Sequence, residues 1–258
     1  MKKLIGKIRK HMFLFEELVK RDFKQRYQRT TLGVLWSVLS PLLTLLTMKI
    51  VFTSFFGRTV NHYTIYLFAG NIVMSFYREA TKNGMTSLLQ NASIITKINV
   101  PKYLFIFSKN VSAFINFILT VLVFFVFCAL DHIPFTVYMF SLILPVICLT
   151  VMNVGIGMIL SILYVRFRDM SYLYDVFLTL LNYLSAIFYD LSTYPENVQR
   201  LFLLNPVYVY IKYFRVVVLD GHLPSVQFSL LSIFYAAFFF TIGSLLYKRF
   251  NSRITYYL

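Results

Sequence analysis

The side chains in this sequence that could do chemistry are suited to holding an anion. Five bases, Lys20, Arg21, Lys24, Arg26 and Arg29, fall within a stretch of ten residues near the start of the chain. Ammonium and guanidinium groups form charge-assisted hydrogen bonds with phosphate oxygens. We therefore expect this segment to meet a negatively charged lipid head group or an acidic partner.

No catalytic or metal-binding pattern accompanies these bases. The histidines are scattered and the cysteines lie inside apolar runs, at His11, His62, His132, His222, Cys128 and Cys148. The sequence contains no Ser-His-Asp or paired-carboxylate arrangement, and it lacks the G-x-x-x-x-G-K-[ST] loop that holds nucleotide phosphates. We expect no reaction, metal or cofactor on this chain, so any ATP hydrolysis must take place on another polypeptide.

The elements that carry these residues are those of a membrane protein. Of the 258 residues, 59% are hydrophobic and 14% are charged, whereas soluble domains are roughly 45–50% apolar. The net charge of +15 could suggest nucleic acid, but the bases flank apolar runs and form no soluble face. Membrane topology therefore explains the charge better than nucleic-acid binding does.

Six apolar runs predict an all-α integral membrane protein with a single membrane domain. A helix needs roughly 20 apolar residues to cross a bilayer. Residues 1–30 are expected to form a cytoplasmic interface helix, 33–247 the membrane region and 248–258 a cytoplasmic tail. The predicted spans are Gly33–Phe56, Tyr63–Tyr77, Tyr103–Leu130, Phe135–Tyr164, Met170–Tyr189 and Val226–Tyr247, the second being short.

The positions of the bases predict that both termini lie in the cytoplasm. With the amino terminus inside, 19 of the 25 Lys and Arg residues fall on the inner side and four on the outer side, as the positive-inside rule requires. Counting Leu201–Leu219 as a seventh span would place the basic tail outside. We interpret that stretch, which Asn205-Pro206 interrupts, as two short helices that dip into the outer leaflet.

The amino-terminal segment has the pattern of an amphipathic helix lying in the membrane interface. Ile8, Met12, Phe15, Val19 and Phe23 recur at spacings of three and four residues, and bases occupy the other side. Such a helix could be a simple anchor. However, it continues directly into the first apolar run, so a change of direction at Gly33 could pass force from a partner to the membrane helices.

Other residues inside the apolar runs suggest either transport or packing. Lys49 could pair with Asp190 at the exit of a pathway, or it could extend its stem towards the interface. Aromatic rings in the apolar runs could pack against lipid, or their faces could offer apolar contacts to a ligand. Small and polar residues suit close helix packing, at Asn153, Gly155, Gly157, Ser161, Ser232, Ala236, Gly243 and Ser244.

Four blocks of sequence resemble the ABC-2 type permeases that export polysaccharides. They are RDFKQRYQRTTLGVLWSVLSPLL at 21–43, NASIITKINVPK at 91–102, VRFRDM at 165–170 and YPENVQRLFLLNPVYVYIKYFR at 194–215. They occur in the same order as in that family, and together they extend over nearly the whole chain. The group includes transporters of O-antigen, capsule and teichoic acid.

The resemblance implies a homodimeric permease in the cytoplasmic membrane that binds two copies of a separate ATPase, which would hold ATP and Mg²⁺. It implies that the substrate is a lipid-linked polysaccharide whose pyrophosphate meets Lys20, Lys24, Arg26, Arg29 and the Gly33 joint. It implies coupling to the ATPase through Arg21, Asp22 and a helix containing Met85, Leu88, Leu89 and Gln90. Because the first and fifth predicted spans resemble the family's pore-forming helices, it also implies that aromatic side chains line a path for the glycan; the candidates are Phe52, Phe55, Phe56, Phe177, Tyr183, Phe188 and Tyr189. An ABC-2 exporter of a drug or small lipid, and a non-transporting membrane scaffold, remain alternatives.

Overall fold

Every element in the described part of the chain is helical. The computed structural model describes residues 2–27, 33–56, 62–98 and 100–257. The α-helices are α1 (Lys2–Tyr27), α2 (Trp36–Phe56), α3 (Tyr63–Gln90), α4 (Ala92–Lys97), α5 (Tyr103–Leu130), α6 (Ile143–Arg166), α7 (Met170–Leu184), α8 (Glu196–Phe202), α9 (Pro206–Val218) and α10 (Val226–Tyr257), with 3₁₀ turns η1 (Gly33–Leu35) and η2 (Val137–Leu142).

Three helical segments among the described residues are long and apolar enough to cross a membrane. They are Tyr103–Leu130, Val137–Arg166 and Val226–Ser252, and the bent pair of α8 and α9 would make a fourth if it counts as one span. The apolar part of α2, Trp36–Phe52, is shorter, and α7 has 15 residues, fewer than the roughly 20 that a crossing needs. The chain is therefore a multi-pass membrane protein, and the sixfold crossing stays a prediction.

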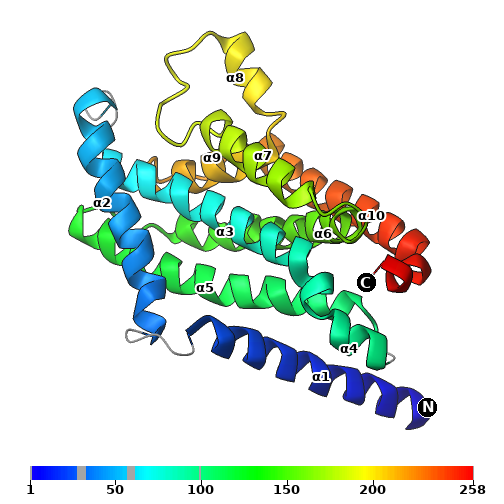
Figure 1. The fold of residues 1–258 in the computed structure, drawn as a ribbon. Coiled ribbons are helices and arrows are strands. Elements are labelled where there is room, and N and C mark those ends of the chain that lie inside the picture. Colours follow the sequence, from blue (N-terminus) through cyan, green and yellow to red (C-terminus); the bar gives the residue numbers. More distant parts are fainter. Residues whose placement is uncertain (1, 28–32, 57–61, 99, 258) are drawn as a thin grey trace.

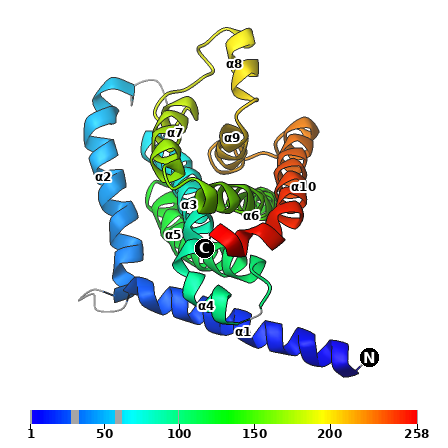
Figure 2. The ribbon, with the colours of Figure 1, turned by 45° about the vertical axis from the view of Figure 1, so that its right-hand side comes forward.

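The centre of the molecule is a bundle in which α3, α5, α6 and α10 run side by side. The most extensive contacts join α6 with α10 and α3 with both α5 and α6. Figure 1 and Figure 2 show that α2 crosses this bundle at a steep angle, while α1 runs beside α5 and extends beyond it at the amino-terminal end. The arrangement leaves one side of the bundle facing α1 and α2.

Glycines allow the central helices to touch backbone to backbone. A Cβ atom added at Gly84 on α3 would lie 2.9 Å from the Cα of Gly157 on α6. A Cβ added at Gly155 on α6 would lie 2.5 Å from the backbone of Phe239 on α10, and one at Gly243 would overlap the carbonyl oxygen of Gly155. The prediction that Gly155, Gly157 and Gly243 serve close helix packing is thus confirmed.

Three predicted helix ends are wrong. The helix that starts at Tyr63 continues past Tyr77 to Gln90, because residues beyond Tyr77 such as Ala80, Met85 and Leu88 still pack into the interior. α10 continues past Tyr247 through most of the predicted tail, where Ile254 is buried. α7 ends at Leu184, before the predicted Tyr189.

The break at Asn205-Pro206 divides a bent pair of helices, as the sequence predicts. The axes of α8 and α9 differ in direction by 109°. The side chain of Asn205 caps α9 by accepting hydrogen bonds from the backbone N–H groups of Val207 and Tyr208, and Pro206 suits the first helical position because it lacks an N–H group.

Candidate functional site

The interface helix α1 is attached to α5 by one narrow face. Leu18 is buried and packs in a cluster with Leu104 and Phe105 of α5, and Leu14 and Phe15 pack against the same cluster. Met12 and Phe13 are exposed. The apolar stripe is therefore divided: Phe15 packs on the docking face, whereas Met12 lies outside it.

Asp22 fixes this attachment with a charge cluster. Its carboxylate, 1% exposed, lies 3.2 Å from Lys109 Nζ and 2.8 Å from Arg21 Nη2. It also accepts a hydrogen bond from the Ser108 hydroxyl at 3.1 Å. The Asp22 oxygens are thus used by α5 and by the neighbouring Arg21, and its coupling to an ATPase stays a prediction.

The bases of α1 have different positions. Lys20 and Lys24 are exposed; Lys20 Nζ is 2.9 Å from Glu17, and this hydrogen bond raises the pKa of Lys20. The side chain of Arg26 and all of Arg29 fall outside the described residues. Between α1 and α2, Gly33 has a φ of +50°, a left-handed conformation that glycine adopts with little cost.

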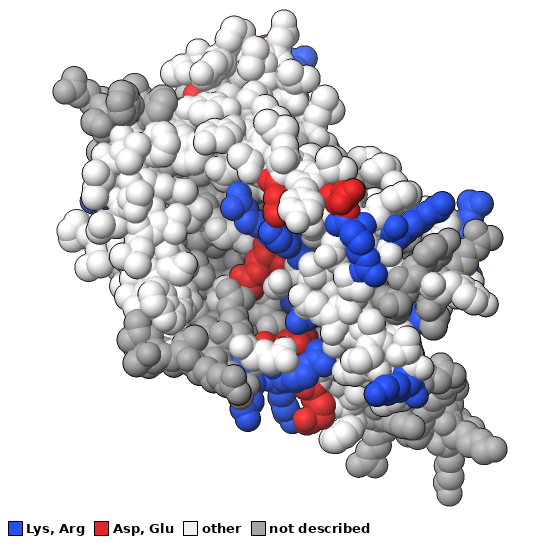
Figure 3. Space-filling view, in the orientation of Figure 1, with Lys and Arg blue, Asp and Glu red and all other residues white. Residues whose placement is uncertain are grey.

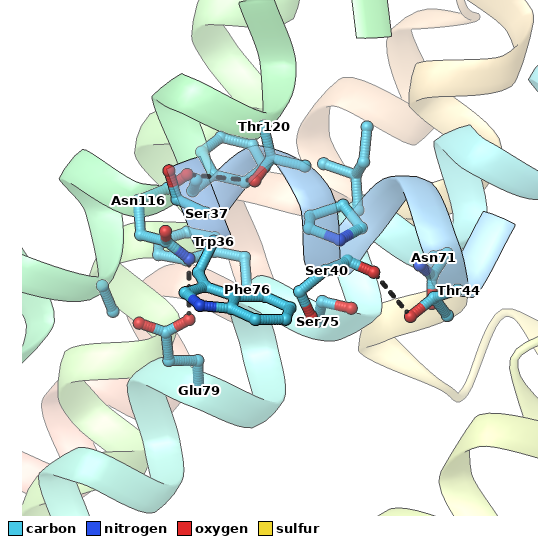
Figure 4. A pocket seen from close by; sticks show the side chains of 14 residues that line it. Trp36, Ser37, Ser40, Thr44, Asn71, Ser75, Phe76, Glu79, Asn116 and Thr120 are labelled. Carbon is cyan, nitrogen blue, oxygen red and sulfur yellow. Dashed lines mark hydrogen bonds between the residues drawn. The ribbon is translucent and has the colours of Figure 1, made fainter. Parts of the chain in front are cut away.

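A polar pocket lies where α2 crosses α3 and α5, just after this joint. Its volume is about 140 Å³, and Figure 4 shows polar side chains from the three helices converging on it. They include Ser37, Ser40, Thr44, Asn71, Ser75, Glu79, Asn116 and Thr120, with Trp36 over one side. Hydroxyl and amide groups in apolar helices are suited to a ligand that needs many hydrogen bonds.

Glu79 connects this pocket with a second one beside α1. Asn116 Nδ2 donates a hydrogen bond to its carboxylate at 3.0 Å (Figure 4). The second pocket, of about 390 Å³, is lined by Glu79 together with Asp22, Gln25, Asn83, Lys109 and Ser112. In Figure 3, charged side chains gather along a hollow on this face of the molecule. We refer to these two pockets, which share Glu79 as a lining residue, as the polar route.

Glu79 and Asn116 are site residues that the sequence alone did not identify. A span that ends at Tyr77 predicts that Glu79 lies in a cytoplasmic loop. The available signal was the helical spacing of Asn71, Ser75 and Glu79, which places three polar residues on one face of α3.

The predicted coupling helix is not a separate element. Met85 and Leu88 belong to α3 and are both 0% exposed, so neither can touch an ATPase; Leu89 is half-buried and Gln90 is exposed. The helix that follows, α4, presents Ser93, Thr96 and Lys97 on its surface. The apolar residues in 85–90 reflect packing against the bundle.

Lys49 and Asp190 do not form a pair. Lys49 is exposed on α2, and the Asp190 carboxylate is held by its own turn: Ser192 N donates to Oδ1 at 3.0 Å and the Ser192 hydroxyl donates to Oδ2. Asp175 pairs with Lys82, whose Nζ is 2.6 Å away. That ion pair joins α7 to α3.

The residues predicted to line a path for the glycan lie in different environments. Phe52 and Phe188 stack with ring centroids 4.5 Å apart, and Phe188 is 7% exposed, so this pair serves packing between α2 and the segment after α7. Phe177 and Tyr183 are exposed on α7. Tyr189 is half-buried and donates a hydrogen bond to the carbonyl of Tyr183. The side chains of Phe55 and Phe56 fall outside the described residues.

Together these features define a membrane transport component: apolar helices, a polar route between three of them, and an attached interface helix. Comparison with known families agrees, because the pattern of the ABC-2 type transporter family matches residues 14–219. The chain belongs to this family.

Curated relatives are similar to the chain over most of their length. An O-antigen export system permease protein RfbA of Klebsiella pneumoniae is 27% identical over 85% of this chain and 86% of its own length. A protein of the same name from Myxococcus xanthus is 24% identical over 87% of each chain. The polysialic acid transport protein KpsM of Escherichia coli is 23% identical over 90% of this chain and 92% of its own.

Proposed function

We propose that this chain is the permease subunit of an ABC exporter that moves a lipid-linked polysaccharide across the cytoplasmic membrane. It works as a homodimer with two copies of a separate ATPase, which bind ATP and Mg²⁺, and both of its termini lie in the cytoplasm. The family membership and the printed names of the relatives support this proposal.

The polar route through Glu79 is the structural observation that carries the proposal. Serine, threonine and asparagine side chains on α2, α3 and α5 face one pocket, and Glu79 also lines the pocket beside the α1 attachment. A sugar polymer needs many weak hydrogen bonds along its path, because tight binding at one point would stop its movement. Hydroxyl and amide groups supply such bonds without a fixed charge.

Coupling to the ATPase takes place through α4 and the exposed side of α1. The exposed residues of α4 follow the end of α3, so a push on α4 reaches the bundle directly. α1 is held on α5 by Leu18 and Asp22, and the joint at Gly33 transmits its displacement to α2. The exposed bases Lys20 and Lys24, with Arg26 and Arg29, meet the pyrophosphate of the substrate.

The exposed aromatic side of α7 faces the translocated polymer at the homodimer interface. Phe177 and Tyr183 lie on this side, where their rings offer apolar surface to the C–H faces of sugars and the Tyr183 hydroxyl adds a hydrogen bond. Phe52 and Phe188 shape the wall behind them.

Depletion of the chain in its own cell tests the proposal. If it exports a polysaccharide, lipid-linked polymer accumulates on the cytoplasmic side while synthesis continues. An exporter of a drug or small lipid would leave the polymer pool unchanged and alter the efflux of the small molecule. Co-purification with an ATPase whose hydrolysis rate depends on this chain separates both transporters from a membrane scaffold.

A further inference from the structure

A separate polar cavity lies where α9 passes the segment after α7. Its volume is about 600 Å³, and its lining comes from the start of α3, the loop after α7 and one side of α9. The polar and charged lining residues include Asp190, Gln199, Tyr208, Lys212, Arg215 and Asp220. None of them lines the route through Glu79, so the cavity is a distinct site.

Arg215 builds the floor of this cavity and holds its walls together. Its guanidinium donates hydrogen bonds to the backbone carbonyls of Ala186 at 2.8 Å, Ile187 at 2.9 Å and Tyr66 at 3.2 Å. Its plane also lies over the Tyr66 ring, 3.4 Å from the centroid. One buried side chain thus links α9, α3 and the break after α7, and a site with a fixed backbone is prepared for a ligand before binding.

Several polar groups face the cavity without a protein partner. Tyr208 is only 4% exposed, yet its hydroxyl makes no hydrogen bond with any residue that the structure describes, while the similarly buried Tyr210 donates to Ser232. One turn further along α9, Lys212 has a ring contact with Phe228 and no carboxylate partner in the described chain. Asp220 likewise has no hydrogen bond or ion pair with described residues. Tyr208 lines the cavity with its hydroxyl unpaired, Lys212 is half-buried and Asp220 is exposed, so a ligand in the cavity can form hydrogen bonds with all three.

We propose that this cavity binds a short segment of an uncharged saccharide through Tyr208, Lys212 and Asp220. The ligand must donate to a carboxylate and accept from an ammonium group and a hydroxyl. A sugar has hydroxyl groups that do both. The size fits a ligand of several rings, since ligand pockets span roughly 300–1,000 Å³.

The charge of the lining gives an acidic sugar or a phosphate no net attraction. Arg215 and Lys212 carry two positive charges, and Asp190 and Asp220 carry two negative charges. Partial burial raises the pKa of Asp220, while His222 and Lys212 oppose that rise. Because these charges balance, the cavity suits a neutral ligand with hydroxyl groups better than an anion. The inference rests on the proposed polysaccharide export and specifies the chemistry of the polymer near its point of exit.

The experiment measures saccharide binding to the purified full-length chain in lipid nanodiscs. Ligand-observed NMR titrations use trisaccharides of mannose, galactose, glucose and N-acetylglucosamine, with trisialic acid as the acidic probe. At least one neutral trisaccharide binds, and trisialic acid binds more weakly or not at all. Tyr208→Phe and Asp220→Asn each raise the Kd about three- to tenfold, the effect of losing one hydrogen bond.

Matched controls are Tyr194→Phe, a tyrosine of the same loop region that does not line the cavity, and Asp169→Asn, an exposed aspartate before α7. Both leave the Kd unchanged, and thermal unfolding of each variant verifies its folding. The inference is overturned if no neutral trisaccharide binds, if trisialic acid binds more tightly, or if the controls weaken binding equally. Polymer export by the chain with its ATPase is measured separately, so a failed cavity with intact export refutes this inference and leaves the proposed function standing.

Discussion

Lys109 on α5 reaches the carboxylate of Asp22 on α1 at 3.2 Å, and neither side chain is open to solvent by more than 15%. The pair joins a helix that was expected to lie free in the membrane interface to a helix of the central bundle. Movement of α1 is therefore movement of α5 as well, unless this contact breaks.

Removing the Asp22 carboxylate should loosen α1. Asp22→Ala leaves Lys109 buried without its partner, and breaking a buried ion pair in this way costs about 3 kcal/mol. We expect a lower midpoint of thermal unfolding of the detergent-solubilised protein and faster proteolysis between α1 and α2. The control is Glu17→Gln, which removes an exposed partner of Lys20 and should change stability by less than about 1 kcal/mol. Equal effects of the two variants would contradict the attachment.

Adding a side chain at Gly155 should separate α6 from α10. The Cβ of Gly155→Val would lie 2.5 Å from the backbone of Phe239, and such overpacking costs about 3 kcal/mol. Expression should fall and the thermal midpoint should drop. Ala237→Val, on the exposed side of α10, adds the same branched side chain without a backbone contact and should behave like the wild type. Wild-type stability of Gly155→Val would show that the two helices are further apart than described.

Nothing lies within 4 Å of a Cβ added at Gly33. A substitution there therefore changes the preferred backbone conformation without causing a clash. Gly33→Val strains a backbone at φ +50° by about 1–2 kcal/mol. The variant should insert and dimerise, yet hydrolyse ATP without exporting polymer. Gly33→Asn is the control, since asparagine tolerates the left-handed region and should retain export. If Gly33→Val exports polymer at the wild-type rate, α1 is an anchor only.

Narrowing the polar pocket should slow export with little effect on folding. Ser75 is exposed and lines the pocket next to α2, so Ser75→Leu places an apolar group in the route without entering the core. We expect polymer export to fall several-fold at normal protein levels. Thr241→Leu, at an exposed position of α10, is the matched change outside the route. A parallel loss of export and of protein amount would indicate a folding defect.

Much of the architecture could be predicted from the sequence, because apolar runs and breakers are local signals. Asn205-Pro206 divides α8 from α9, and the glycines of α6 and α10 lie at helix contacts, as their small size suggested. The ends of the helices were harder to predict from the sequence. The residues after Tyr77 read as a loop because they carry Arg78, Glu79 and Lys82, whereas packing of Met85 and Leu88 extends α3 to Gln90.

Residue pairs across the fold were the least predictable part of the site. Lys49 and Asp190 looked like partners because both are charges in apolar surroundings, but Ser192, two residues from Asp190, satisfies that carboxylate locally. Asp22 and Lys109 are far apart in the sequence, and their pairing depends on the angle at which α1 meets α5. Partner choice of this kind is decided by tertiary geometry.

The backbone contacts at Gly84, Gly157, Gly155 and Gly243 join α3, α6 and α10. Where main chains touch directly, there are no side-chain rotamers to adjust, so the joined helices can only stay together or separate completely. We therefore expect α3, α6 and α10 to move as one rigid unit. Among the described residues, no glycine contact of this kind joins α1, α2 or α7 to that unit, so we expect the relative movement of a transport cycle to involve these three helices.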